Sequence, residues 1–178
     1  MIEKLERKGR IEELSPPQTL QKIGFTARES ICDIGAGTGI FTFAAASFTK
    51  ESVYAVEISN QLLEHLQKRK QELGADNVTI ENNISHVPSA SCDKALLCTV
   101  FHELEDTGEM LEDIWRVLRP CGTLAIIEFL PRKTPYGPPV EHRWSPQAVA
   151  EQLTTHRFEQ SDVFDLGENF YVLLATKR

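Results

Sequence analysis

The chain has 178 residues, of which 41% are hydrophobic and 25% are charged, a composition that suits one globular domain with a full apolar core. Its formal net charge of −7 argues against a broad electrostatic grip on nucleic acid or on an anionic membrane surface. No apolar run reaches the roughly 18 residues of a membrane span, and the charged first residues lack a signal core. We therefore expect a single cytoplasmic domain, residues 1–178, with no nucleic-acid or membrane partner.

The four cysteines, at positions 32, 92, 98 and 121, lack the spacing of a metal-binding motif. Two of them lie in apolar runs typical of strands, and neither Cys98 nor Cys121 stands in a recognisable nucleophile arrangement. We therefore expect inert thiols in a reducing compartment and no metal site.

The first elements in chain order lead from a charged arm into a strand. Residues 1–14 mix charges and predict a partly ordered N-terminal arm. Ser15 and Pro16 have the cap-then-proline form of a helix start, and Gly24 is its stop signal. A short apolar strand is predicted over 30–34, and a glycine-rich turn then leads into a helix over 40–48.

The rest of the chain alternates strands with helices and closes with a hairpin. Strands are predicted over 52–57, 77–82, 94–100 and 124–128, and helices from Ser59 to Gly74, from about 107 to Pro120 and from Ser145 to about 156. Two last strands, over 158–164 and 170–175, are separated by the short turn 165–168. This order predicts the α/β class, with a mainly parallel sheet that has one antiparallel strand near its end.

The turn after the first strand carries glycines at alternate positions, Gly35, Gly37 and Gly39. Glycine allows left-handed or crowded backbone and lets a ligand approach where a Cβ would collide. Ligands of parallel α/β sheets bind outside the carboxyl ends of the strands, and the first strand-to-helix turn is a usual place. The turn therefore predicts a small-molecule site, although glycine turns also serve plain helix–sheet packing.

A carboxylate at the end of the second strand, Glu57, can accept hydrogen bonds from both hydroxyls of a ribose. A nucleoside is thus the favoured ligand, and an NAD-dependent oxidoreductase is one alternative. The alternate glycine spacing departs from the dinucleotide fingerprint G-x-G-x-x-G, and the predicted sheet uses the whole chain without a second domain. Both features favour another adenosine cofactor. A non-catalytic cofactor-binding module is a third possibility.

The joint occurrence of several motifs in the right order resembles a class I S-adenosylmethionine-dependent methyltransferase. The motifs are Asp33-Ile34-Gly35-Ala36-Gly37-Thr38-Gly39, then Val56-Glu57, then Asn82-Asn83-Ile84, then Arg116-Val117-Leu118-Arg119-Pro120-Cys121-Gly122-Thr123-Leu124. The resemblance covers roughly residues 15–178 and is closest to the small-molecule branch that includes the ubiquinone/menaquinone-biosynthesis enzymes. It implies a Rossmann-like three-layer sandwich whose seven-stranded sheet has the order 3-2-1-4-5-7-6, with strand 7 antiparallel.

The resemblance also implies a set of residues that bind S-adenosyl-L-methionine. The methionine part would lie on Gly35, Ala36 and Gly37, with Asp33 near its ammonium group. Glu57 would hold the ribose, and Ile58 would pack on the adenine. Asn83, beside Ile84, stands where this family commonly has Asp, and its amide oxygen can still accept a bond from the adenine amino group. Thr99 would lie beside the sulfonium with the residues that follow it, up to His102.

His102 is the best candidate for a catalytic base, because it follows the fourth strand at the expected mouth of the site. Glu103 could hold or tune it, or could be only a carboxylate near the start of the next helix. Methyl transfer needs an aligned and desolvated nucleophile, so a general base is optional.

The proline-rich loop 131–144 is either a substrate lid or a surface crossover. Phe101, Tyr136 and His142 are candidate substrate contacts. The chain lacks the Asn/Asp-Pro-Pro-aromatic motif of enzymes that methylate amino groups on bases. We therefore expect a small-molecule acceptor; a protein acceptor stays open, as does a homo-oligomer.

Overall fold

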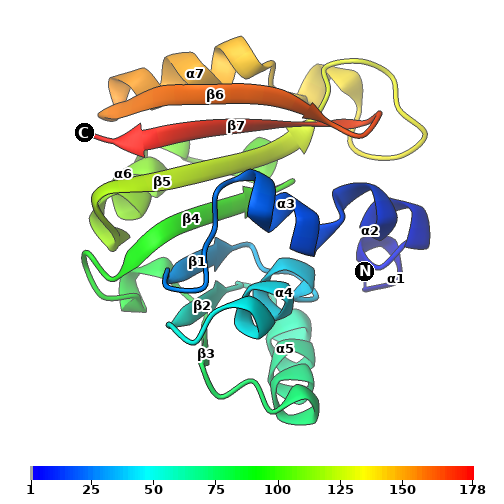
Figure 1. Ribbon diagram of the computed structural model, residues 1–178. Coiled ribbons are helices and arrows are strands. Elements are labelled where there is room, and N and C mark those ends of the chain that lie inside the picture. Colours follow the sequence, from blue (N-terminus) through cyan, green and yellow to red (C-terminus); the bar gives the residue numbers. More distant parts are fainter. Residues whose placement is uncertain (1) are drawn as a thin grey trace.

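A computed structural model describes residues 2–178, which form one seven-stranded sheet covered by helices on both faces (Figure 1). The strands are β1 Ile31–Ile34, β2 Val53–Val56, β3 Val78–Glu81, β4 Cys92–Cys98, β5 Leu118–Phe129, β6 Phe158–Leu166 and β7 Phe170–Lys177. The helices are α1 Ile2–Leu5, α2 Lys8–Leu14, α3 Pro16–Lys22, α4 Ile40–Phe48, α5 Asn60–Leu73, α6 Thr107–Val117 and α7 Pro146–Thr155. Short 3₁₀ turns are η1 Ile84–His86, η2 Phe101–Glu103 and η3 Val140–His142.

The strand order is β3-β2-β1-β4-β5-β7-β6, and β7 alone runs antiparallel to both of its neighbours. This confirms the predicted fold class and strand order. Every residue of β1 is buried, and so is nearly all of β4, which is the pattern of parallel strands covered on both faces.

Two apolar layers fill the space between sheet and helices. Side chains of α3, α4 and α5, including Leu20, Phe41 and Leu66, pack on one face of the sheet. Side chains of α6 and α7, including Ile114 and Leu153, pack on the other. The carboxyl ends of β1, β2 and β4 therefore meet at one edge between the layers, beside α1 and α2 (Figure 1).

Two segments differ from the sequence-based expectation. The N-terminal arm is not a partly ordered lead-in, because residues 2–14 form α1 and α2. Strand β5 begins at Leu118 rather than near 124, since Leu118 pairs with Cys92 and the ladder resumes with Thr123 opposite Lys94. The intervening residues form a bulge that accommodates Pro120, which cannot donate to a ladder.

Candidate active site

The glycine turn between β1 and α4 lies at the edge where the parallel strands end. Gly35 and Gly37 have φ of +68° and +57°, a region that side-chain-bearing residues rarely adopt. A Cβ on Gly35 would lie 2.4 Å from Cγ2 of Val100. The backbone N–H groups of Gly35 and Ala36 donate to Val56 O at 2.8 and 3.0 Å, which fixes the turn against β2. The turn is thus a cradle of closely packed glycine backbone held against β2.

Glu57 follows β2 and holds this cradle in place. Its side chain accepts hydrogen bonds from the backbone N–H groups of Gly37 and Ser59, both at 2.9 Å, and the residue is only 7% exposed. Next to it, Ile58 is 86% exposed. A buried carboxylate beside an uncovered apolar side chain suits a ligand with a polar sugar and an apolar ring.

Asp33 lies beneath the cradle in β1 and is almost fully buried. Its carboxylate accepts a hydrogen bond from the Thr42 hydroxyl at 2.6 Å. Burial, together with the charge of the nearby Glu57, raises the pKa of Asp33 to about 6, against the opposing effect of the Thr42 hydrogen bonds. The buried charge of Asp33 is therefore unfavourable in the ligand-free protein, and a cationic ligand would stabilise it.

The N-terminal helices close over the cradle. Leu5 Cδ1 lies 3.4 Å from the position of a Cβ on Gly37. Arg10 is 8% exposed and donates to Thr99 Oγ1 and to Leu5 O, each at 3.0 Å. Both acceptors are neutral, and the guanidinium forms no ion pair with a carboxylate anywhere in residues 2–178. Such a buried cation at a ligand site favours an anionic group on the ligand.

The sequence reading missed Arg10. It lies in a charged segment without motif or apolar periodicity, so only the three-dimensional structure brings it to the end of β4. Thr99, its partner, has a φ of +58°, which a β-branched residue rarely adopts. Strain of this kind concentrates at functional sites.

Helix α2 is anchored near its C-terminal end by Glu13. The Glu13 carboxylate accepts from the Tyr136 hydroxyl at 2.6 Å and from Glu168 N, Asn169 N and Asn169 Nδ2, each at 2.7 Å. These bonds join α2 to the 131–144 loop and to the β6–β7 turn. On the N-terminal side of α2, the Glu6 carboxylate lies 3.5 Å from the Arg69 guanidinium of α5.

His102 stands in η2, directly after β4. Its Nδ1 lies 2.9 and 3.0 Å from the two carboxylate oxygens of Glu128, a residue of β5 that is 0% exposed. Glu103, the predicted partner, is 3.7 Å from His102 Nε2, with a side chain 73% exposed. Glu128, which the sequence analysis placed only at the end of a strand, is therefore the hydrogen-bond partner of His102, and Glu103 remains a second, exposed carboxylate beside the ring.

A cavity of about 520 Å³ opens beside His102, between η2 and the loop that follows β5. It is lined by His102, Pro131, Glu141, His142, Arg143, Trp144, Ser145 and Ala148. Of the predicted substrate contacts, this cavity includes His142. Its volume is in the range of small-molecule sites.

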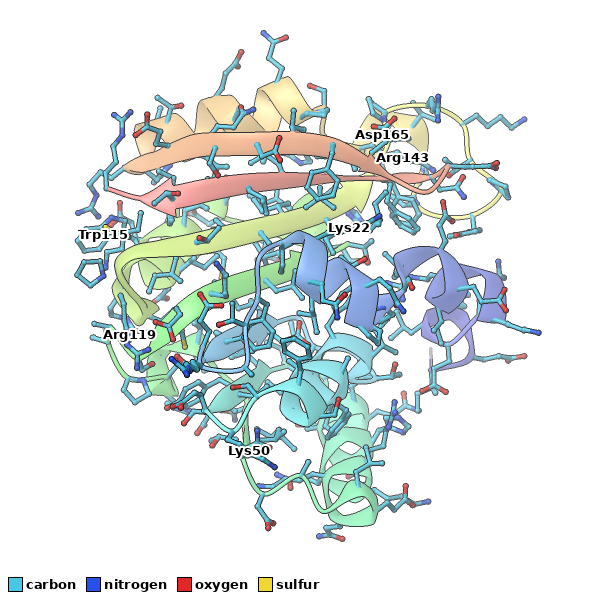
Figure 2. All side chains as sticks on the ribbon, in the orientation of Figure 1. Lys22, Lys50, Trp115, Arg119, Arg143 and Asp165 are labelled. Atoms are coloured by element: carbon cyan, nitrogen blue, oxygen red, sulfur yellow. The ribbon has the colours of Figure 1, made fainter. Side chains whose placement is uncertain are left out.

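The 131–144 loop is built around Arg143 (Figure 2). The Arg143 guanidinium donates to the backbone oxygens of Leu130, Arg132 and Pro138 at 2.6 to 3.0 Å and lies 5.0 Å from the centre of the Phe129 ring. These bonds hold the loop as a fixed wall of the cavity in this structure.

Phe101 and Tyr136 are placed differently from the expectation, and Asn83 and Ile84 make contacts within the protein that the sequence did not predict. Phe101 is 0% exposed and packs edge-on against Trp144, so its side chain is core. Tyr136 binds Glu13 and does not line the cavity. The amide oxygen of Asn83 accepts from Ser85 N at 2.8 Å and caps η1. Ile84 is 5% exposed in the apolar layer of α6 and α7, which leaves only its backbone for a ligand.

The sequence matches the family described as a methyltransferase domain over residues 32–126, more than half of the chain. Over 107 residues, it is 31% identical to a demethylmenaquinone methyltransferase of Tropheryma whipplei, which covers 60% of this chain and 44% of that protein. A ubiquinone/menaquinone biosynthesis C-methyltransferase of Haemophilus ducreyi is 27% identical over 119 residues, 62% of this chain and 45% of that protein. The chain thus spans less than half the length of these relatives.

Solved structures show the same architecture. A SAM-dependent methyltransferase from Aquifex aeolicus superimposes with a TM-score of 0.92 at 25% identity, over 98% of this chain and 96% of that one. The cyclase SpnF shares the fold with a TM-score of 0.79 at 16% identity, over 97% of this chain and 85% of that one. The family match, the strand order and the glycine cradle agree, and the chain belongs to the class I S-adenosylmethionine-dependent methyltransferases.

Proposed function

We propose that the protein binds S-adenosylmethionine on the glycine cradle and transfers its methyl group to a small-molecule acceptor. The observation that supports this most is the cradle itself, in which Gly35 and Gly37 have positive φ and the buried carboxylate of Glu57 accepts a hydrogen bond from Gly37 N. The bound cofactor supplies an electrophilic methyl group on a sulfonium sulfur. The protein has to hold it, align an acceptor with it and keep water away.

The residues of the site fit the parts of this cofactor. Glu57 offers a carboxylate to the ribose hydroxyls, and the uncovered Ile58 offers an apolar surface to the adenine. Asp33 is a buried anion for the ammonium group, as the resemblance implied. Asn83 keeps a second lone pair on its amide oxygen for the adenine amino group, and Thr99 lies at the end of β4.

We assign the carboxylate of the cofactor to Arg10. The guanidinium is buried beside the cradle and donates hydrogen bonds to two neutral oxygens. Its helix, α2, is held near the C-terminal end by the hydrogen bonds of Glu13. A carboxylate would replace weak neutral contacts by charge-assisted hydrogen bonds. Helix α2 would then be part of the cofactor site rather than a lead-in.

A variant of Arg10 separates this assignment from a purely structural role. Arg10→Met is expected to weaken binding of S-adenosylhomocysteine by about 10- to 100-fold, because charge-assisted hydrogen bonds are lost. Binding of methylthioadenosine, which lacks the amino-acid end, should stay within about 2-fold. Isothermal calorimetry with both ligands measures this, and Arg178→Met, an exposed residue remote from the cradle, is the control. Equal losses for both ligands would contradict the assignment.

Asp33 gives a prediction with a defined pH window. Its pKa is higher in the folded protein than its ordinary value of 3.8, so its contribution to folding is present below pH 4 and is lost as the pH rises through about 6. Asp33→Asn removes that loss, so the free energy of unfolding of the ligand-free protein should rise by about 1 to 3 kcal/mol at pH 7.5. Near pH 4 the gain should vanish.

Thermal melts of both proteins at pH 4 and 7.5 measure this difference, and groups common to both cancel. The same variant should bind S-adenosylmethionine more weakly, since the ammonium loses its anion. A stability difference between the two proteins that does not change with pH would show that the buried Asp33 carboxylate does not destabilise the fold.

The acceptor is proposed to be a small molecule, since the cavity beside His102 has the volume of one and the curated relatives are named for quinone biosynthesis. Methyl-labelled S-adenosylmethionine is incubated with a panel of quinols, phenols and thiols, and transfer of label to one class supports the proposal. SpnF shows that the fold also carries a cyclase, so binding alone does not establish transfer. Tight cofactor binding without any transfer, together with a protein partner in pull-downs, would favour a binding module.

A further inference from the structure

Glu128 is a buried carboxylate with a fixed set of partners. It lies next to the last residue of β5 and accepts from His102 Nδ1 at 2.9 and 3.0 Å, from His102 N at 3.4 Å and from Phe129 N at 3.2 Å. It is 0% exposed, so no water competes for these positions. An isolated carboxylate there would be costly, and the pairing with a histidine is what makes the position tolerable.

This contact fixes the state of the imidazole. Both oxygens of Glu128 are acceptors, so Nδ1 carries the proton in the neutral form, and Nε2 is left with a free lone pair. The His102 ring lies 6.3 Å from the Phe129 ring, edge-on, which restricts its rotation. Since His102 lines the 520 Å³ cavity and Nδ1 is engaged, Nε2 is the nitrogen available to a bound molecule.

Charged groups of both signs surround the ring. They are Glu128 of β5, Glu103 of η2, and Arg143, His142 and Glu141 of the loop that closes the cavity. Burial lowers the pKa of His102, and the charge of Arg143 lowers it as well. The hydrogen bond and the charge of Glu128, together with the charge of Glu103, have the opposite and larger effect. The pKa of His102 is therefore raised above its usual value. The ring is therefore a stronger proton acceptor than a free histidine.

The cavity combines this ring with apolar walls. Pro131, Trp144 and Ala148 provide flat or apolar surface, and Trp144 is held by Phe101 at a ring distance of 5.3 Å. The Trp144 carbonyl accepts from the buried Tyr171 hydroxyl at 3.0 Å, which fixes the backbone of this wall. Such a site suits a ring with one polar substituent.

The cavity and the cofactor cradle are connected through the segment that follows β4. Val100, whose side chain lies 2.4 Å from the position of a Cβ on Gly35, is the N-cap of η2 and precedes His102 by two residues. The neighbouring strands β1 and β4 run parallel, so the cradle and η2 both follow carboxyl ends of adjacent strands.

We propose that the cavity is the acceptor site and that it binds an aromatic or enolic ring bearing a weakly acidic O–H. His102 is the catalytic base for this acceptor, and Glu128 is the residue that positions His102. This rests on the methyltransferase function proposed above. The acceptor O–H bond breaks, and its proton moves to His102 Nε2. The electron pair stays on the oxygen and forms the new bond to the methyl carbon as the pair of the old carbon–sulfur bond remains on sulfur. The imidazolium beside Glu128 later releases its proton to water.

The test uses 4-nitrophenol, a phenol whose ionisation is visible by absorbance and which need not be methylated. In the protein saturated with S-adenosylhomocysteine, bound 4-nitrophenol is expected to ionise at a pH about 1 unit lower than the free phenol, because the imidazolium favours the phenolate. His102→Gln should abolish this shift, and Glu128→Gln and Glu128→Asp should reduce it. Glu159→Gln, at an exposed carboxylate of β6 that pairs with Arg178, is the control and should keep the shift. Glu103→Gln should reduce the shift less than Glu128→Gln does, because Glu103 lies 3.7 Å from His102 Nε2 and is exposed.

The outcomes separate the possibilities. Absence of binding or of a shift in the unaltered protein overturns the acceptor class, and an undiminished shift in His102→Gln overturns the base. Equal effects of Glu103→Gln and Glu128→Gln overturn the positioning role. Calorimetry with S-adenosylhomocysteine on the same variants should give an affinity close to that of the unaltered protein; failure of the unaltered protein to bind it would instead contradict the function proposed above. Melting temperatures identify any variant that does not fold, and the remaining Glu128 variant then decides.

Discussion

Gly35→Ala is expected to lower the stability of the protein by about 2 to 4 kcal/mol and to eliminate detectable binding of S-adenosylhomocysteine. Alanine at a φ of +68° costs about 1 to 2 kcal/mol by itself. Its Cβ would also lie 2.4 Å from Val100, so the side chain or the cradle must move. Thermal melts and calorimetry measure the two effects.

The matched control is Gly74→Ala, at the end of α5. Gly74 has a φ of +59°, but nothing lies within 4 Å of its Cβ position. This variant should lose only the conformational part, about 1 to 2 kcal/mol, and should bind the ligand normally. Equal destabilisation and equal binding in the two variants would mean that the cradle does not need the close approach that we ascribe to it.

Glu57→Ala is expected to weaken binding of S-adenosylhomocysteine by about 10- to 150-fold, or about 1.5 to 3 kcal/mol, through loss of charged hydrogen bonds to the ribose. Stability should fall as well, because the N–H groups of Gly37 and Ser59 lose their acceptor. Glu57→Gln should recover part of the stability, since its amide oxygen still accepts one of these bonds, but little of the affinity.

Glu81→Ala provides a comparison for Glu57. Glu81 ends β3 as Glu57 follows β2, and its carboxylate lies 3.2 Å from His86 Nδ1. It should leave the dissociation constant unchanged within about 2-fold. A dissociation constant that is also unchanged in Glu57→Ala would remove Glu57 from the ligand site.

The sequence predicted the fold well because its signals are local. The glycine turn, the cap of α7 at Ser145 and the helix end at Gly74 each depend on a few adjacent residues, and the structure has all of them. The closing hairpin of β6 and β7 was enough to predict the antiparallel strand. The start of β5 was misplaced because Pro120 in a bulge has the same local signal as Pro120 in a turn.

The site residues that were missed depend on long-range contacts. Arg10 reaches Thr99 across 89 residues, and Glu128 reaches His102 across 26. Nothing local distinguishes Arg10 from its charged neighbours, and Glu128 looks like any strand-end residue. Phe101 was misassigned for the complementary reason, since an aromatic residue near a site has the same sequence signal whether it faces the ligand or the core.

The described residues contain neither a helix suited to crossing a membrane nor a group of three His, Cys, Asp or Glu side chains placed to hold a metal. The chemistry proposed here uses only the cofactor and the side chains around it. In the account proposed above, Arg10, Asp33 and Glu57 would each provide one charged contact, to the carboxylate, the ammonium and the ribose of the cofactor, and His102 with Glu128 would serve the acceptor. These two groups of residues can therefore be tested separately.

Calorimetric titration of the unaltered protein with S-adenosylhomocysteine tests the central claim most directly. We predict a single site with a dissociation constant in the micromolar range, about −8 kcal/mol, and competition by S-adenosylmethionine for the same site. No heat of binding from either ligand at millimolar concentration would contradict the account.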